Sequence, residues 1–388
     1  MTATQNIAII GAGLGGLACA LALQRQGIKV RVYEKAQDFR PVGGGLALFP
    51  NGLNFLKLID SNLVEEIQNY GCCLHKIVKK NINGETISSS LTSQLREKYG
   101  QSIVTIWWWH LQQVLKSKLP QDIIHLDHQC IGFEQEDQTV KIYFKGGKTA
   151  SADLLIGADG IHSTVRKTLI GDEPPRYLNS VSWRATLKCD QDILNHDELV
   201  RIVGEQQFLF LLNVGNGYLN WTTRKFEAEY CPSANHKFMK ERLLQDLANW
   251  SDPIRNIIEI TPASKIVEFP ICDRPPIKNW SKGRITLLGD AAHPMSPLMG
   301  QGANSTFEDA WVLAQCFARF STVEQALKQY EQERIERTKI LQIKSGSGEK
   351  NQWKAQDQTQ PQPKRNLDSS FMDWLYKYKP FSVDPLHE

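Results

Sequence analysis

A glycine-rich segment between a short apolar strand and a helix constrains this chain more than any other feature. The segment Gly-Ala-Gly-Leu-Gly-Gly occupies residues 11–16 and directly follows the apolar residues 7–10. In such a turn, the first glycine permits the sharp bend, the second lets a diphosphate approach the backbone, and the third allows close helix–strand packing. The free N–H groups at the start of the helix then face the diphosphate. The segment predicts a βαβ unit with a dinucleotide site.

A carboxylate ends the second strand of this unit. Glu34 follows the strand-like residues 30–33, in the place from which an acidic side chain accepts hydrogen bonds from both ribose hydroxyls. Each such hydrogen bond to a charged group contributes about 1.5–3 kcal/mol. The alternative is an ordinary βαβ turn with a surface glutamate. Both NAD and FAD bind through this pattern, so the choice between them stays open at this point.

The rest of the chain alternates between strand-rich and helical patterns. Residues 130–156 have the pattern of a meander with a hairpin turn at Gly146-Gly147, and residues 179–226 form a second strand-rich region. We predict an α/β fold with a doubly wound, Rossmann-like nucleotide-binding domain, a β-sheet-rich substrate domain and C-terminal helices. The nucleotide-binding domain takes residues 1–70, 101–175 and 271–345, and the substrate domain takes residues 71–100 and 176–270.

The C-terminal part of the chain divides into three stretches. Residues 322–345 contain no Gly or Pro and predict a helix. Residues 345–365 are polar and carry Gln and Pro, which predicts an extended segment or linker. Aromatic residues return at positions 371–381, and we expect them to pack against the body of the protein. Residues 346–388 are therefore treated as a separate C-terminal segment.

Composition narrows the range of partners. The chain has 388 residues, enough for two packed units, and its net charge of +3 is too small to favour nucleic acid or an anionic membrane. The eight cysteines include no CxxC pair, which argues against a metal site or a disulfide framework and fits a reducing compartment. The first residues show no signal-peptide pattern, and every apolar run is shorter than a membrane span. We expect a cytoplasmic protein without a transmembrane segment.

Two further motifs accompany the glycine segment. Residues 153–166 contain Asp159 in an Asp-Gly pair, and residues 283–294 contain Asp290 in a Gly-Asp pair, followed by the Pro- and Gly-bearing loop at residues 297–304. Together the three motifs resemble those of the class A flavoprotein monooxygenases, the para-hydroxybenzoate hydroxylase type. That family includes salicylate and 3-hydroxybenzoate hydroxylases and a zeaxanthin epoxidase-like branch. The resemblance runs from about residue 5 to about residue 345 of the chain.

The resemblance implies FAD as the cofactor and assigns contacts to it. In the family, the residue matching Asp290 accepts a ribityl hydroxyl, and the following helix N-terminus faces the flavin edge where negative charge grows on reduction. Cys130 stands where the family has a small apolar residue whose backbone touches adenine. For Arg166, a solvated helix cap and a ligand contact are equal alternatives. The expected FAD-binding residues are Gly11, Gly13, Leu14, Gly15, Gly16, Glu34, Lys35, Gly44, Gly45, Gln112, Cys130, Asp159, Asp290, Pro297, Gly300, Gly302, Ala303 and Asn304.

One departure from the family concerns a run of three tryptophans at residues 107–109. The family often has an Arg near the flavin just before the position of Leu111, and Trp108 stands in its place here. Gln112 is the remaining candidate for a polar contact on that side of the ring. A stacking role for the tryptophans competes with a simpler interpretation, an alternating strand with one buried face.

The resemblance also implies the reaction. In the family, a nicotinamide donor reduces FAD, O2 adds at the flavin C4a, and the resulting hydroperoxide oxygenates a small organic substrate. The chain has no second glycine fingerprint for a nicotinamide domain, so NADH or NADPH is expected as a co-substrate. Aromatic hydroxylation is the leading hypothesis. The alternatives are epoxidation or hydroxylation of a larger hydrophobic molecule and a non-oxygenating FAD-binding protein. The chain is expected to be a monomer or a homodimer.

The substrate is expected between the flavin and the strand-rich region. Arg184 is the preferred anchor for an acidic substrate, because a buried carboxylate needs a cationic partner. Since side chains alternate along a strand, only part of any such set faces the site. No catalytic residue is named, because a structural role is expected for each of His162, His196 and His293. The residues expected to line the substrate pocket are Arg184, Phe210, Leu212, Trp221 and Thr223.

Overall fold

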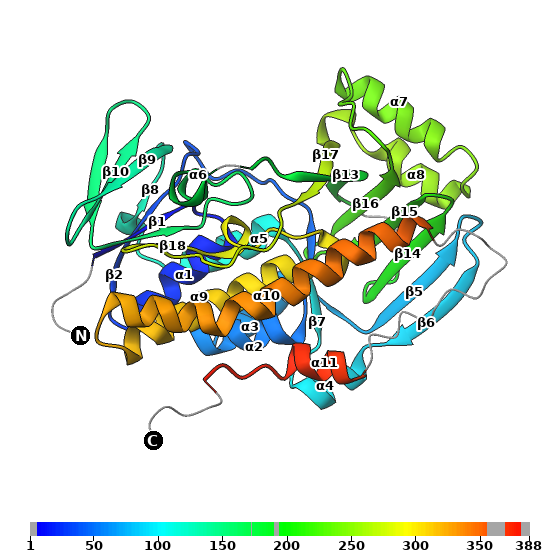
Figure 1. Ribbon diagram of the computed structural model, residues 1–388. Helices are drawn as coiled ribbons and strands as arrows, with labels where there is room; N and C mark the ends of the chain where they lie inside the picture. The colour runs from blue at the N-terminus through cyan, green and yellow to red at the C-terminus, as the bar shows by residue number, and fades with distance from the viewer. Residues whose placement is uncertain (1–5, 172, 190–193, 355–368, 382–388) are drawn as a thin grey trace.

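The computed structural model describes residues 6–171, 173–189, 194–354 and 369–381. Figure 1 shows a lobe built on a parallel sheet and a second lobe built on a larger sheet, with helix α10 (Val323–Lys354) running along both. The parallel sheet has the strand order β18-β12-β1-β2-β8. Its strands are β1 (Asn6–Ile10), β2 (Lys29–Tyr33), β8 (Ile124–His125), β12 (Leu154–Gly157) and β18 (Ile285–Leu287).

Helix α1 (Leu14–Arg25) connects β1 to β2 and completes the βαβ unit that the sequence predicts. Its residues from Gly16 to Leu23 are buried, because α9 (Gln301–Arg319) packs on it from the side away from the sheet. The small residues Ala18, Ala20 and Ala22 allow this close packing. The other helices of this lobe are α2 (Pro50–Ile59), α3 (Leu63–Tyr70), α5 (Trp108–Ser117) and α6 (Thr164–Ile170).

Two small antiparallel sheets flank the parallel one. The predicted meander forms a three-stranded sheet of β9 (Cys130–Gln135), β10 (Val140–Phe144) and β11 (Thr149–Ala152). Its predicted hairpin turn is present, and both Gly146 and Gly147 have positive φ angles of 87° and 84°. A second small sheet joins β3 (Gly45–Leu48), β7 (Ile103–Trp107) and β4 (Cys72–Leu74).

The larger sheet has seven strands in the order β17-β13-β16-β15-β14-β5-β6. Helices α7 (His236–Asp246) and α8 (Asp252–Ile260) cover one face, where Val181, Trp183 and Ala185 of β13 join their core. Because side chains alternate, Arg184 faces the opposite side, toward the parallel-sheet lobe. The strands are β5 (Lys76–Asn81), β6 (Thr86–Leu91), β13 (Arg176–Lys188), β14 (Glu198–Gly204), β15 (Gln207–Asn213), β16 (Tyr218–Phe226) and β17 (Val267–Asp273).

The C-terminal region differs from the sequence prediction. Helix α10 does not end near residue 345 but continues to Lys354, so the expected extended segment is wrong for residues 345–354, and residues 355–365 lie outside the described part. Two glycines and a glutamate pack this end of the helix against the protein: a Cβ on Gly348 would lie 2.7 Å from Leu298. Helix α11 (Ser369–Tyr376) packs beside α4 (Ser93–Tyr99), as expected for the aromatic stretch.

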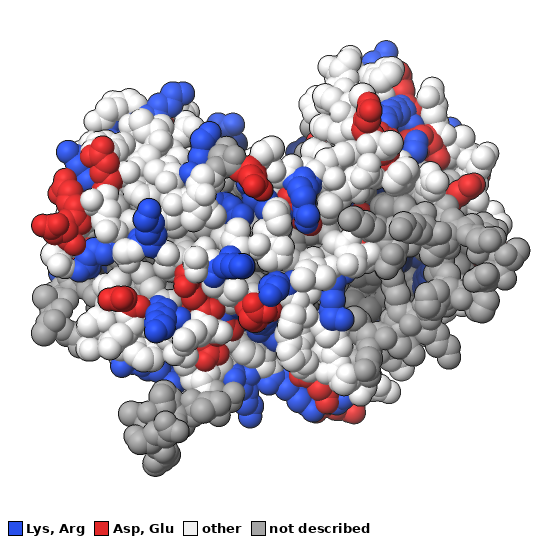
Figure 2. Space-filling view, viewed as in Figure 1, with Lys and Arg blue, Asp and Glu red and all other residues white. Residues whose placement is uncertain are grey.

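Charged side chains of both signs are mixed over the face in Figure 2, and no large area carries one sign alone. Within residues 6–171, 173–189, 194–354 and 369–381, no helix has the length and apolarity needed to cross a bilayer. The α/β architecture is the one that the sequence predicts.

Candidate functional site

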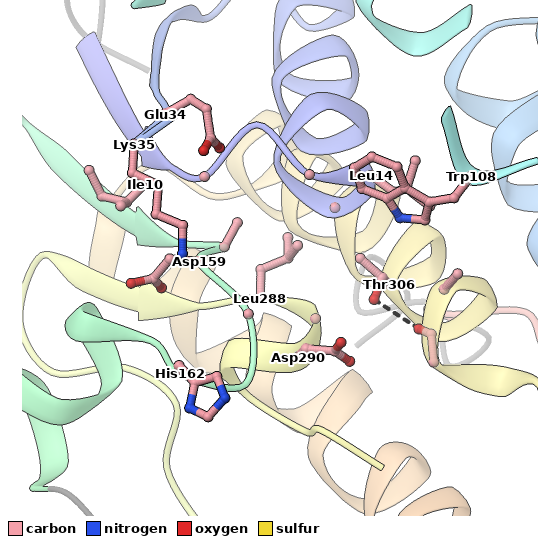
Figure 3. Close-up of a pocket in the computed structure, with 18 of the residues that line it drawn as sticks. Ile10, Leu14, Glu34, Lys35, Trp108, Asp159, His162, Leu288, Asp290 and Thr306 are labelled. Atoms are coloured by element: carbon pink, nitrogen blue, oxygen red, sulfur yellow. Dashed lines mark hydrogen bonds between the residues drawn. The ribbon is translucent and has the colours of Figure 1, made fainter. Parts of the chain in front are cut away.

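A cavity of about 710 Å³ opens where the parallel strands β1, β12 and β18 end. This is the edge of a doubly wound sheet at which ligands bind. Figure 3 shows side chains from all three sequence motifs around it, with Glu34 at one end and Trp108 at the other. The predicted cofactor residues that line it are Gly11, Gly13, Leu14, Gly15, Glu34, Lys35, Gly45, Cys130, Asp159, Asp290, Pro297, Gly300, Gly302 and Ala303.

Each of the three fingerprint glycines, Gly11, Gly13 and Gly16, is needed for a different structural reason. Gly11 has a φ of 104°, and a Cβ there would lie 2.5 Å from the carbonyl oxygen of Ala158. A Cβ on Gly16 would lie 1.9 Å from the carbonyl oxygen of Gly11, so only glycine lets the helix pack this closely. Gly13 meets nothing within 4 Å and borders the cavity, which leaves its backbone open to a ligand. These are the bend, packing and approach that the sequence predicts.

The Glu34 carboxylate is fixed at the end of β2. One oxygen accepts the backbone N–H of Ala12 at 2.8 Å, and the other accepts that of Ala36 at 2.9 Å. Each carboxylate oxygen can accept a further hydrogen bond, and Glu34 lines the cavity. Cys130 lines the same end, and burial raises the pKa of its thiol to about 11, so the thiol is protonated at neutral pH.

Asp290 lies in the short helix η3 (Gly289–Ala291), directly after β18, and its carboxylate faces the cavity. The surrounding protein shields this carboxyl group from bulk water and raises its pKa, although the side chain is exposed to the open cavity; His293 partly offsets the rise and Asp309 adds to it. The Arg166 guanidinium donates to the carbonyl oxygens of Ala291 at 3.0 Å and Ala292 at 2.9 Å. Arg166 is thus neither a solvated helix cap nor a cavity residue. It is buried and holds the turn that presents Asp290.

Behind this turn lies a fully buried network of charges. Arg334 on α10 donates to Asp309 at 2.7 Å and to Glu308 at 2.6 Å, and Asp309 lies 2.6 Å from His293. Burial alone would raise the pKa of Asp309, but His293 and Arg334 outweigh it and hold the pKa below its ordinary value. The backbone N–H of Gly289 also donates to Asp309. The network therefore ties α9 and α10 to the Asp290 turn. His293 is buried in it and does not line the cavity, so it is placed as a structural residue.

Asp159 plays a double part at the start of α6. Its carboxylate accepts the hydroxyl of Ser163 and the backbone N–H groups of Thr164 at 2.7 Å and Val165 at 3.2 Å. Burial raises the pKa of Asp159, and these hydrogen bonds partly offset the rise. The side chain caps the helix and also borders the cavity.

Four predicted residues lie behind the cavity wall instead of on it. Gly16 packs α1 against the Gly11 turn, and a Cβ on Gly44 would lie 2.8 Å from the Arg184 side chain. The Gln112 amide donates to the Ala12 carbonyl at 2.8 Å, so it braces the glycine turn. The Asn304 amide bridges the backbone of Phe49, Ala47 and Gly300, which fixes strand β3 to the start of α9.

The tryptophan run does not form one alternating strand, so that interpretation is wrong. Trp107 ends β7, and Trp108 begins helix α5, which turns its side chain toward the cavity. The backbone N–H of Trp108 donates to the Gly44 carbonyl at 2.9 Å, and a Cβ on Gly43 would lie 2.7 Å from the Trp108 side chain. An indole thus occupies the wall beside the 43–45 loop.

The large sheet closes the cavity with Arg184. Its guanidinium lies 4.6 Å from the ring centroid of Phe269, and burial lowers its pKa. Within the described residues, its Nε has no hydrogen-bond partner and no carboxylate lies within ion-pair distance. Trp221 and Thr223 were wrong as lining residues, because both side chains belong to the helix-covered face of the sheet and are fully buried there.

Sequence reasoning missed several residues of the wall. Thr306 lies one turn into α9, and its hydroxyl donates to the Gly302 carbonyl at 2.9 Å (Figure 3). His162 borders the cavity, whereas His196 lies beside Cys72. In the described ranges, no group of three or more His, Cys, Asp or Glu side chains is arranged to hold a metal ion. The other unpredicted lining residues include Tyr33, Leu46, Ala47, His128, Gln129, Leu288 and Met295.

The residues of this cavity fit FAD. The backbone at Gly13 is open for a diphosphate, and α1 points its N-terminus there. At the other end, Gly300 has a φ of 65° and precedes α9, whose N-terminal residues line the cavity and would place a helix N-terminus beside a flavin edge. A Cβ on Gly302 would meet only the Asp290 carboxylate, at 3.8 Å, which leaves room beside the backbone for a flat ring.

Comparisons with known proteins agree with this site. Residues 4–342 match the family described as FAD binding domain. The chain is 33% identical over 337 residues to an aurachin C monooxygenase/isomerase of Stigmatella aurantiaca, which covers 86% of this chain and 85% of the relative. It is 29% identical to a 6-hydroxynicotinate 3-monooxygenase of Bordetella bronchiseptica, over 88% and 91% of the two chains.

A solved structure of Klebsiella pneumoniae HpxO complexed with FAD and uric acid has the same fold. The match has a TM-score of 0.84 at 25% identity and covers 96% of this chain and 92% of that one. The cavity, the three motifs and these matches lead to one assignment. The chain belongs to the FAD-binding-domain family and is an FAD-dependent enzyme of the class A flavoprotein monooxygenases.

Proposed function

We propose that this chain uses NADH or NADPH and O2 to hydroxylate a small aromatic or heteroaromatic substrate. The observation that carries the proposal is the single cavity that joins the three FAD motifs to Arg184 on the large sheet. FAD supplies the redox chemistry when it is bound, taking up hydride and passing one oxygen atom of O2 to the substrate. The relatives named for hydroxynicotinate and uric acid support a flat, nitrogen- or oxygen-substituted ring.

The residues of the chain take distinct parts in this proposal. Glu34 accepts the ribose hydroxyls of FAD, the start of α1 binds the diphosphate, and Asp290 accepts a ribityl hydroxyl. The N-terminus of α9 stabilises negative charge on the reduced flavin edge. The 43–45 loop, Trp108 and Arg184 enclose the ring side and keep water away from the reacting atoms.

The proposal includes the partners and the division of the chain. The nicotinamide donor binds as a co-substrate, since the sequence has no second glycine fingerprint. The FAD-binding domain takes residues 1–70, 101–175 and 271–345, and the substrate domain takes 71–100 and 176–270. A cytoplasmic location fits the cysteine pattern of the sequence, which contains no CxxC pair, and a monomer or homodimer is proposed as the assembly.

The purified protein is expected to be yellow, with about one non-covalently bound FAD per chain. Small aromatic acids and heteroaromatics are then expected to stimulate NAD(P)H oxidation and to yield a hydroxylated product by mass spectrometry. If only larger neutral hydrophobic molecules yield an oxygenated product, the epoxidase-like alternative replaces aromatic hydroxylation. Peroxide release without product from every compound would support the non-oxygenating alternative, and a colourless protein that takes up no FAD would refute all three.

Asp290→Ala is expected to weaken FAD binding by about 1.5–3 kcal/mol, the contribution of a hydrogen bond to a charged acceptor. The fold should survive, because the turn is held by Arg166 and Asp309 and not by the Asp290 side chain. Fluorescence titration of the apoprotein with FAD measures the effect, and circular dichroism reports the fold. Asp137→Ala in the exposed β9–β10 turn is the matched control. Equal FAD affinity in both variants would remove Asp290 from the proposed contacts.

A further inference from the structure

The last turns of α10 carry a fully buried carboxylate, Glu349. One of its oxygens accepts the guanidinium of Arg224 at 2.8 Å and the hydroxyl of Ser296 at 2.7 Å. Arg224 belongs to β16 of the large sheet, and Ser296 belongs to the loop after the Asp290 motif. A single oxygen atom thus joins the C-terminal helix, the large sheet and the parallel-sheet lobe.

Burying the Arg224–Glu349 ion pair at this interface costs desolvation free energy. Arg224 and Glu349 are both buried, and burial lowers the pKa of Arg224 while Glu349 raises it. In the described part of the chain, the second Glu349 oxygen and the Arg224 Nε have no hydrogen-bond partner. Apolar residues of similar volume often serve a buried interface equally well or better. The pair is therefore better explained by the geometry that it fixes than by stability.

The Arg224–Glu349 pair contacts the segments that form the cavity wall. Ser296 lies between Met295 and Pro297, and both of these neighbours line the cavity. The carboxylate therefore reaches the wall from behind, through one hydroxyl. Arg224 lies on the same face of the large sheet as Arg184, two positions away from it across the β13–β16 register. The same carboxylate thus contacts both the loop and the sheet that border the cavity.

Two other contacts hold α10 against this loop. The Gln342 amide donates to the Pro294 carbonyl at 3.2 Å and to the Arg274 carbonyl at 3.1 Å. Gly348 packs on Leu298 in the short helix η4 (Pro297–Met299), where a Cβ would lie 2.7 Å from the end of the leucine side chain and would force it to shift. In Figure 1, α10 runs from α9 to the strands of the large sheet, so its end is placed to set the spacing of the two lobes.

We propose that Glu349 is a positioning residue that holds the loop of residues 294–300 and the large sheet together behind the flavin cavity. Through Ser296 it sets the wall beside the flavin, and through Arg224 it sets the distance of the sheet that carries Arg184. The C-terminal helix is then part of the active-site frame. The inference rests on the proposed placement of the flavin ring beside this loop.

The test uses bound FAD alone, without turnover. Glu349→Gln is expected to raise the accessibility of the flavin to iodide, measured as collisional quenching of flavin fluorescence, by about fivefold, because a neutral amide oxygen accepts weaker hydrogen bonds from Arg224 and Ser296 than the carboxylate does. The visible circular dichroism of the flavin should change with it, because the wall beside the ring moves. Glu336→Gln is the control on the same helix, since Glu336 is exposed and paired only with Lys339. It should leave both signals unchanged.

Two further variants separate positioning from stability. Ser296→Ala keeps the ion pair but removes the hydroxyl that links it to the loop, so iodide access should rise as in Glu349→Gln. Arg224→Met combined with Glu349→Met removes both charges and covers the case in which Glu349→Gln alone does not fold. Its flavin should also become more accessible. If Ser296→Ala and the double variant bind FAD with wild-type quenching and circular dichroism, the pair only stabilises the interface and the proposal is wrong. Failure to hydroxylate an aromatic substrate would leave this result untouched.

Discussion

Arg334→Met is expected to lower the free energy of unfolding by about 3–5 kcal/mol, the usual loss when a buried carboxylate loses its partner. Arg334 is fully buried and is the cation that both Glu308 and Asp309 share. Methionine fills much of the space but removes one cation from each carboxylate, which leaves Arg337 beside Glu308 and His293 beside Asp309. Because Asp309 also holds His293 and the Gly289 turn, FAD retention should fall together with stability. Denaturant unfolding of the apoprotein and FAD titration measure the two effects.

The pH dependence of the loss has a definite sign. In the wild-type protein, the pKa values of Glu308 and Asp309 lie below their ordinary values, so their contribution to stability is present above about pH 4 and is lost as the pH falls further. In Arg334→Met, each carboxyl group loses one of the two cations that lower its pKa, while Glu308 keeps Arg337 and Asp309 keeps His293. Both pKa values therefore rise relative to the wild type, and the stability deficit of the variant shrinks as the pH falls toward about 4. A deficit that is constant with pH would contradict the assigned charges.

Lys339→Met is the control for this experiment. Lys339 lies five residues along the same helix, and its ion pair with Glu336 is solvent-exposed. Exposed pairs contribute about 0–1 kcal/mol, so unfolding should change by no more than that. A similar loss in both variants would mean that the substitution disturbs α10 itself and not the buried network.

The nucleotide end of the site was predictable because the contacts that require its residues are local in the sequence. Gly11 and Gly16 are required by backbone contacts within one βαβ unit, and Glu34 ends the strand next to it. Asp290 was predictable for the same reason, since it directly follows a buried strand at the ligand-binding edge of the sheet. Most residues that these motifs contact lie within the same βαβ unit or at the end of the same strand, so a pattern of a few residues is enough to predict their roles.

The remaining parts of the site depend on contacts between distant segments. In the sequence, Arg166 has the pattern of a surface residue on a helix. In the structure it is buried, and its guanidinium donates to the carbonyl groups of residues 291 and 292, which are far away in the sequence. Gly346 and Gly348 suggest a linker, yet Gly346 lies against Asp273 at the end of β17 and Gly348 lies against Leu298 in η4. Trp221 was misplaced because alternation predicts two faces but does not say which of them meets α7 and α8.

Contacts between distant segments also distinguish the arginines of the large sheet. The sequence alone could not show which of them has a carboxylate partner and which faces the cavity. Arg224 is neutralised by Glu349, a residue 125 positions away on a helix that the sequence did not extend that far. Arg184 has no such partner within the described residues and borders the cavity. Desolvating the half-buried Arg184 guanidinium without a carboxylate partner costs free energy, and a substrate that brings an anion would offset that cost.

Arg184→Met is therefore expected to abolish the stimulation of NAD(P)H oxidation by carboxylated phenols while FAD content stays at about one per chain. Loss of the buried partner of a carboxylate weakens binding by about 2–5 kcal/mol, which raises the KM for the acid by at least about thirtyfold. Methionine keeps the apolar contact with Phe269, so the wall itself should stay in place. Arg255→Met, at an exposed i,i+4 pair on α8, is the control. If Arg184→Met retains acid-stimulated turnover, or loses its FAD, then Arg184 braces the two lobes and does not anchor the substrate.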